Sequence, residues 1–161
     1  RGLLGIRSRY LTATRGDGLF SSYLIEYAPH KGDIPHRLNG ALIADRTGES
    51  IEYALLTLEE RGVLFLKPGV KVYEGMIIGE NNRDNDLEIN PLRSKQLTNV
   101  RASGKDEAIR LVPPKVMTLE QAITYIEEDE RVEVTPKSIR IRKAILDPNE
   151  RKKFEKSRNN L

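Results

Sequence analysis

The 161-residue sequence contains no cysteine and no tryptophan, and aromatic residues make up only 6% of it. The absence of cysteine excludes disulfides and thiolate metal sites. The two histidines, His30 and His36, lie in one turn-rich connection without a second group of ligands, whereas metal sites need about three or four convergent ligands. No apolar run approaches the roughly 18 to 20 residues of a membrane-spanning helix. We therefore expect neither a metal site nor a membrane partner.

The motifs of nucleotide chemistry are also missing. The sequence has no GxxxxGK(S/T) phosphate-binding loop and no strand-led GxGxxG, so the chain by itself is not expected to bind or split a nucleoside triphosphate. We interpret its densest carboxylate run, residues 127–130, as a solvated acidic surface, because adjacent acids are not an acid/base pair placed across a cleft. We predict no catalytic residue and no cofactor in this chain.

The formal net charge of +3 conceals a strong alternation along the chain. Basic residues are in excess in residues 1–37 (+3), 89–110 (+3) and 137–161 (+6). Acidic residues are in excess in residues 38–88 (−5) and 111–136 (−4). Charge blocks of this size create local fields that the net value hides. A polyanion would be attracted to three segments and repelled by the two between them.

The first 37 residues predict a helix followed by a strand. Apolar side chains in residues 3–13 recur at helical spacing, and Gly16 is a natural stop. Residues 18–29 are rich in aromatic and aliphatic side chains and predict a strand that ends at Pro29. Polar turns with prolines follow, so we place a domain boundary after residue 37.

The next segment predicts short strands around one helix. Residues 40–45 indicate a strand, and Ser50 can cap a helix that ends at Gly62. Residues 63–80 predict two strands joined by a turn at Pro68 and Gly69, and residues 87–89 a brief further strand.

The last third carries clearer signals. Thr118 and Gln121 match a capping box that opens a helix. Residues 131–146 alternate between apolar and polar and predict a half-buried strand with Arg140 and Arg142 on its outer face. Asp147 is placed to cap a final cationic helix that starts at Pro148. Residues 107–113 predict one more strand.

One segment fits neither helix nor strand. From Ile89 to Lys105 it contains no acidic residue, while Arg93, Lys95, Arg101 and Lys105 are positive. Neutral donors such as Asn99 lie between them, and such side chains contact phosphate and sugar. The segment has no aromatic side chain for stacking on bases, so we predict phosphate contact rather than base-specific recognition.

Two function classes remain open at this point. In the first, the basic segments bind RNA, and the candidate contacts outside the central segment lie on the first helix and the last strand: Arg7, Arg9, Arg15, Arg140, Arg142 and Lys143. In the second, the chain is a protein-interaction module whose acidic blocks at 38–88 and 127–130 meet a basic partner without RNA contact.

Several stretches together resemble the C-terminal third of the BipA (TypA) translational GTPases. The resemblance covers nearly the whole chain and rests on RGLLGIRSRYLTATRG, YALLTLEERG, VYEGMIIGE, RDNDLEIN, LTNVRASGKDEA and MTLEQAITYIEEDERVEVTPKSIRIRK. The first stretch is also similar to the end of the fifth domain shared with elongation factor G.

The resemblance implies an α+β fold in two parts. Residues 1–37 would be the second half of a ferredoxin-like domain. Residues 38–161 would be the family-specific domain, mixed and mostly antiparallel, with two or three helices. That domain would carry a long basic loop at 90–106 and a basic tail at 144–161.

The resemblance also implies a function. Members of the family are cytoplasmic, ribosome-binding GTPases linked to large-subunit assembly and to growth under stress such as cold. GTP and magnesium would be bound by domains that precede this region. The loop would reach ribosomal RNA near the A site and the tRNA acceptor end, through Arg93, Lys95, Asn99, Arg101 and Lys105. The oligomeric state stays open.

Overall fold

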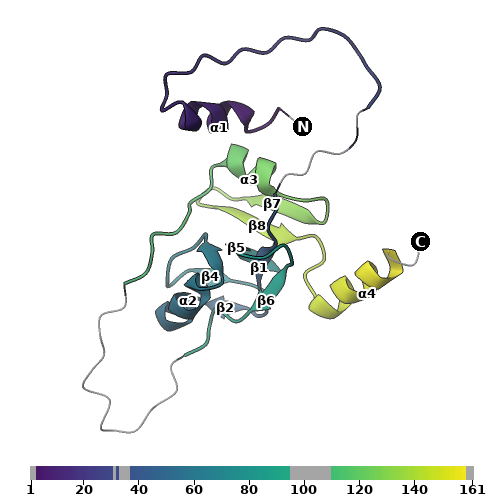
Figure 1. The fold of residues 1–161 in the computed structure, drawn as a ribbon. Coiled ribbons are helices and arrows are strands. Elements are labelled where there is room, and N and C mark those ends of the chain that lie inside the picture. Colours follow the sequence, from purple (N-terminus) through teal and green to yellow (C-terminus); the bar gives the residue numbers. More distant parts are fainter. Residues whose placement is uncertain (1–2, 31, 33–36, 95–109, 159–161) are drawn as a thin grey trace.

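A computed structural model of the chain describes residues 3–30, 32, 37–94 and 110–158 (Figure 1). The elements in these residues are α1 (Ile6–Ala13), β1 (Ala41–Ala44), β2 (Gly48–Glu49), α2 (Glu52–Glu59), β3 (Gly62–Leu64), β4 (Lys71–Val72), β5 (Met76–Asn81), β6 (Leu87–Ile89), α3 (Leu119–Tyr125), β7 (Glu130–Val134), β8 (Ile139–Lys143) and α4 (Pro148–Arg158).

The main sheet has the strand order β6-β1-β5-β8-β7, with β3 also paired to β5. The pair β1–β6 is parallel, and the pairs β1–β5, β3–β5, β5–β8 and β7–β8 are antiparallel. Strands β2 and β4 form a separate antiparallel pair. The prediction of an α+β fold with a mixed, mostly antiparallel sheet after residue 38 is confirmed for the described residues, which contain three helices in that part.

Both faces of the sheet are covered at its centre. Helix α2 packs Leu55 against one face, in a cluster with Leu42 and Ile78. Helix α3 lies on the other face, where Ala122 meets Ile43 and its strand neighbours (Figure 1). Successive side chains of a strand point to opposite faces, so the four apolar residues of β1 serve both clusters and are all buried.

The sheet divides at β5. Strand β1 occupies one edge of β5, so β3 and β8 share the other edge. β8 pairs with β5 at Met76 and Ile77, and β3 takes over from Gly79 to Asn81. The start of β8 and the end of β3 therefore lie on either side of an opening in the sheet, which we call the fork.

The strand predicted for residues 18–29 is absent. These residues form no helix or strand, and apolar side chains such as Leu19 and Tyr27 are almost fully exposed (Tyr27 to 95%). A strand requires a neighbour that pairs with its main chain, and no described strand offers one to this segment. The predicted ferredoxin-like arrangement of residues 1–37 therefore stays a prediction.

In the middle of the chain one local prediction was wrong and another was incomplete. Ser50 does not cap α2: its hydroxyl donates to the Lys67 carbonyl and accepts from the Val70 N–H, and Ile51 is the N-cap residue. The prediction of two strands joined by the turn at Pro68 holds in part: β3 before the turn pairs with β5 after it, and a third, short strand, β4, lies between them and pairs with β2.

Two predictions near the C-terminus need correction as well. Residues 131–146 do not form a single strand; most of them belong to the hairpin of β7 and β8, which turns at residues 135–138. Residues 110–113 form no strand, and residues 107–109 lie outside the described part of the chain. This segment runs along α2 instead, where Val112 N–H donates to Glu59 Oε1 at 2.6 Å.

The predicted caps of the last two helices are confirmed. Thr118 Oγ1 accepts from Gln121 N–H at 3.3 Å, and Gln121 Oε1 accepts from Thr118 N–H at 3.0 Å, which is a complete capping box. At α4, Asp147 Oδ1 accepts from Glu150 N–H at 2.8 Å.

We expect Thr118→Ala to lower the free energy of unfolding by about 1 kcal/mol, because the helix loses an acceptor for one of its first N–H groups. Thr118→Ser keeps that acceptor and serves as the control. Urea unfolding of the two variants checks the difference; equal midpoints would contradict the role of the cap.

Candidate nucleic-acid interface

The predicted arginines do not form one surface. Arg7, Arg9 and Arg15 are exposed on or just after α1. The start of α1 packs on α3: a side chain at Gly5 would come within 2.8 Å of Thr124. The arginines of β8 lie on the sheet face opposite to the one that α3 covers. If both groups bind RNA, they do so at different places.

Arg140 and Arg142 lie side by side on the sheet face that α3 does not cover. Cross-strand partners share a face, so Arg140 stands opposite Glu133 and Arg142 opposite Arg131 on β7. The alternate residues of both strands point to the α3 side, where Ile141 is buried. A shallow hollow lies over the arginine side, lined by both β8 arginines, Glu133, Tyr73 and their neighbours.

These arginines are not neutralised. Among the described residues, neither Arg140 nor Arg142 forms an ion pair with a carboxylate within 4.0 Å, and Arg142 donates to the Lys143 carbonyl at 3.1 Å. Glu133, the nearest acid across the hairpin, instead accepts a hydrogen bond from the Tyr73 hydroxyl. Half-buried guanidinium groups without a carboxylate partner are suited to a bidentate anion such as phosphate.

Tyr73 holds Glu133 in this arrangement. Burial raises the pKa of the Tyr73 hydroxyl well above its usual value, and the hydrogen bond and charge of Glu133 raise it further, against a smaller opposing effect of Arg142 and Arg140. The hydroxyl therefore stays protonated as a donor at neutral pH. As a result the surface, which we call the arginine face, carries Arg131, Arg140 and Arg142 against one carboxylate.

Lys143 must be removed from the predicted RNA contacts. It is buried, and its ammonium lies 2.7 Å from Asp129 Oδ2 and 3.0 Å from Glu130 Oε1. Burial alone would lower its pKa, but the charge of Glu130 and the hydrogen bonds of Asp129 and Asp86 outweigh that effect and raise it. The residue stays charged at neutral pH and is fully engaged inside the protein.

Lys143 belongs to a cluster of six charged residues that the sequence did not reveal. We call it the interior ion cluster; its members are Arg37, Asp86, Glu127, Asp129, Glu130 and Lys143. At its centre, Arg37 Nη1 and Nη2 donate to the two oxygens of Glu130 at 2.7 and 2.6 Å. Burial opposes the charge of Arg37, yet the hydrogen bond and charge of Glu130 raise its pKa above the usual value.

The acidic run 127–130 is therefore not simply a solvated surface. Glu127 and Glu128 are exposed, but Glu130 is 0% exposed. The signal was present in the alternation: Glu130 shares its face with Val132 and Val134, just as Lys143 shares one with Ile141. The period of two that places apolar side chains inward places these two charges inward as well.

The basic segment after β6 is only partly described. Arg93 is exposed, whereas Lys95, Asn99, Arg101 and Lys105 lie outside the described residues. Just before the segment, Pro91 is buried and its carbonyl accepts from Ile51 N–H at the start of α2. The chain beyond it is fixed to Glu59, at the other end of α2, through Val112. Helix α2 thus anchors both ends of the segment.

The pattern of the TypA/BipA C-terminal domain family matches residues 39–148. The chain belongs to this family. The proteins named "Large ribosomal subunit assembly factor BipA" of Buchnera aphidicola subsp. Schizaphis graminum and of Escherichia coli strain K12 are each 51% identical to it, over 100% and 98% of the chain. The corresponding protein of Haemophilus influenzae is 51% identical over 98%. The chain spans 26–27% of the length of these relatives.

The matched part of this BipA C-terminal domain contains every described strand, from β1 to β8, together with α2 and α3. The arginine face and the fork lie inside it, while Arg37 reaches the interior ion cluster from just before it. Among the described residues there is no group of three or more histidine, aspartate or glutamate side chains arranged to hold a metal ion. None of the described helices is long and apolar enough to span a membrane.

Proposed function

We propose that this chain is the RNA-binding C-terminal module of a BipA-like translational GTPase, and that it contacts ribosomal RNA of the large subunit through phosphate groups. The observation that carries the proposal is the pair Arg140 and Arg142, held on an uncovered sheet face without carboxylate partners. Relatives over the whole chain are named large ribosomal subunit assembly factors, which supports a ribosomal ligand.

The finer assignment follows the family resemblance. The module approaches the A-site region and the tRNA acceptor end with the basic segment 90–106, through Arg93, Lys95, Asn99, Arg101 and Lys105. The arginine face adds a second set of phosphate contacts, and Arg7, Arg9 and Arg15 a third. The whole protein acts in the cytoplasm, in large-subunit assembly and in growth under stress such as cold.

The module binds and does not catalyse. The family implies GTP and magnesium, but neither fits the residues present: the sequence contains no phosphate-binding loop, and the described carboxylates are not arranged as a metal site. In this proposal both are bound and used by domains that precede the module, and the module contributes position on the ribosome.

We expect the double variant Arg140→Glu/Arg142→Glu to bind purified large ribosomal subunits at least about tenfold more weakly than the unchanged chain, because two phosphate contacts are replaced by repulsion. The slope of log affinity against log salt concentration should become less steep by roughly 2, because each lost contact to a duplex phosphate removes about 0.9 from its magnitude. Co-sedimentation at several salt concentrations measures both quantities.

Arg61→Glu/Arg83→Glu is the matched control, since both arginines are exposed within the acidic block 38–88 and should not matter. Unchanged affinity and slope in the Arg140→Glu/Arg142→Glu variant would refute the arginine face as an RNA contact. Retention of subunit proteins after nuclease digestion would instead favour the protein-interaction alternative.

A further inference from the structure

The fork exposes main-chain groups that the sheet leaves unpaired. The N–H of Lys143 donates to the Gly75 carbonyl on the β5 side, at 2.9 Å. Residues two apart along a strand direct their main-chain groups to the same side, so Ile139 also directs its N–H and C=O away from β7. At the level of Ile139, β5 pairs with β3 and no longer with β8. Within the described residues, Ile139 therefore has no strand partner on that side.

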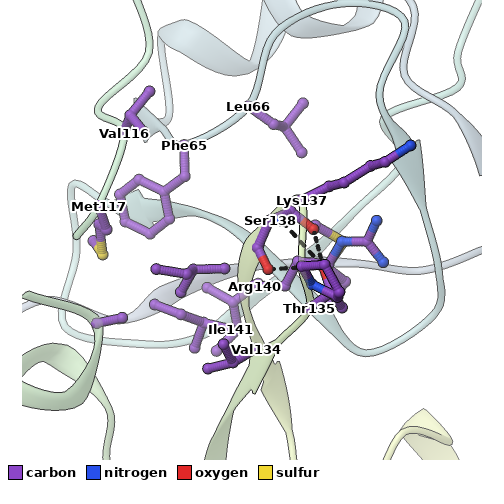
Figure 2. A pocket seen from close by; sticks show the side chains of 15 residues that line it. Phe65, Leu66, Val116, Met117, Val134, Thr135, Lys137, Ser138, Arg140 and Ile141 are labelled. Atoms are coloured by element: carbon purple, nitrogen blue, oxygen red, sulfur yellow. Dashed lines mark hydrogen bonds between the residues drawn. The ribbon is translucent and has the colours of Figure 1, made fainter. Parts of the chain in front are cut away.

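The fork is also an apolar cavity. It has a volume of about 540 Å³, and Phe65, Met117 and Ile141 line it from three different segments (Figure 2). At its margin, Val116 is 75% and Val134 61% exposed, although both are apolar. Water therefore contacts apolar surface, and a ligand that covered this surface would gain free energy from its burial.

The charge of the rim has one sign. None of the 15 lining residues is acidic, whereas Lys137 and Arg140 are basic. The hydroxyl groups of Thr135 and Ser138 hydrogen-bond to each other across the turn (Figure 2). A ligand with a carboxylate beside apolar groups would match this rim and the cavity behind it.

We propose that the fork is a docking site for an extended peptide segment of a protein partner, one that carries apolar side chains next to carboxylates. Such a segment would pair its main chain with Ile139 and place alternate side chains in the cavity, as in strand addition to a sheet edge. Its acidic side chains would meet Lys137 and Arg140.

A peptide fits this cavity better than a nucleotide base. Recognition of a base requires a stacking surface and polar partners for its edge. Phe65 is the aromatic residue of the lining, and its ring packs edge-on against Tyr125 at 5.4 Å between centroids. The remaining apolar lining is aliphatic or methionine, which suits aliphatic side chains. The peptide site shares Arg140 with the arginine face, but the proposal rests on the fork and does not require the RNA-binding function.

The test is a titration of the ¹⁵N-labelled full chain with an eight-residue synthetic peptide that alternates valine and glutamate. We expect saturable shifts of the Ile139 amide and of the amides of Val116 and Val134. A peptide of alternating valine and lysine should bind at least about tenfold more weakly, since it meets cations of its own sign.

Substitutions in the rim sharpen the test. Val134→Asn should weaken binding of the acidic peptide at least about tenfold because it removes an apolar contact without adding charge, whereas Val112→Asn, at a site exposed outside the cavity, should leave binding unchanged. Lys137→Glu should abolish the preference between the two peptides, because the new carboxylate offsets the remaining charge of Arg140. Arg142→Glu should not affect the peptides, which separates this site from the arginine face.

Three results would overturn the proposal. Absence of saturable shifts with the acidic peptide is the first, and equal binding by the Val134→Asn variant is the second. The third is a single-stranded oligouridylate that shifts the same fork amides more strongly than the peptide does, because the occupant would then be RNA.

Discussion

Replacement of Arg37 by alanine is expected to lower the free energy of unfolding by about 3 to 5 kcal/mol. Its side chain is 5% exposed, and it donates two hydrogen bonds to a carboxylate that has no contact with solvent. Its guanidinium also lies 4.7 Å from the centre of the Tyr125 ring. Without Arg37, Lys143 is the single cation of the cluster against Glu130 and three other acids. The buried carboxylate of Glu130 then loses two hydrogen bonds, and its charge is only partly compensated.

Denaturant unfolding followed by circular dichroism measures this loss. Arg46→Ala is the control, because Arg46 forms an equally short pair with Asp45 at the surface and should change nothing measurable. A double-mutant cycle with Glu130→Gln isolates the coupling of the two residues. If Arg37→Ala cost no more than the control, the interior ion cluster would not hold this part of the chain.

Replacement of Arg93, Lys95, Arg101 and Lys105 together by alanine should produce the largest loss of ribosome binding. The four cations lie in a segment without a single carboxylate between Ile89 and Lys105, so the segment itself contains no acid that would compete with a phosphate. The slope of log affinity for large subunits against log salt concentration should become less steep by roughly 3 to 4, because each of the four lost phosphate contacts removes about 0.9 from its magnitude. The melting temperature should hardly change.

The control is a second fourfold alanine variant, of cations that are exposed within the acidic block: Arg46, Arg61, Lys71 and Arg83. It removes the same charge and should keep both affinity and slope. Undiminished co-sedimentation of the first variant would show that the basic segment is not the RNA contact.

The capped helices and several strands could be predicted from the sequence because their signals are local. Thr118 and Gln121 satisfy each other within one turn, and Asp147 satisfies the N–H of Glu150. Residues 41–44 are apolar and sit between polar turns, which is enough to indicate a buried strand. Such patterns do not depend on the rest of the chain.

Pairing between distant segments could not be predicted in this way. Ser50 stands at the position of an N-cap residue. Its hydroxyl instead hydrogen-bonds to the Lys67 carbonyl and the Val70 N–H, so it does not cap the helix. Residues 18–29 have the composition of a strand, yet composition does not supply the neighbour that a strand needs. In both cases the local structure depends on contacts with residues far away in the sequence.

The candidate site was predicted in part. Arg140 and Arg142 were correctly placed on an outer face by their alternation with Ile139 and Ile141. The same alternation, continued by one step, would have placed Lys143 inside. The partner that makes its burial tolerable, Glu130, lies on the adjacent strand and is recognised only once the register of the hairpin is known.

The order of strands in the sheet also governs when the domain can form during synthesis. β1 and β5 are both synthesised early and can pair at once. The edge of β5 at Met76 and Ile77 stays unpaired until β8, which ends at Lys143, has been synthesised. Arg37 remains without its partner Glu130 for longer still, because 93 residues separate the two. A ribosome adds about 5 to 20 residues per second, so the emerging chain carries an unpaired strand edge for several seconds. The domain closes only when its last strand has left the tunnel.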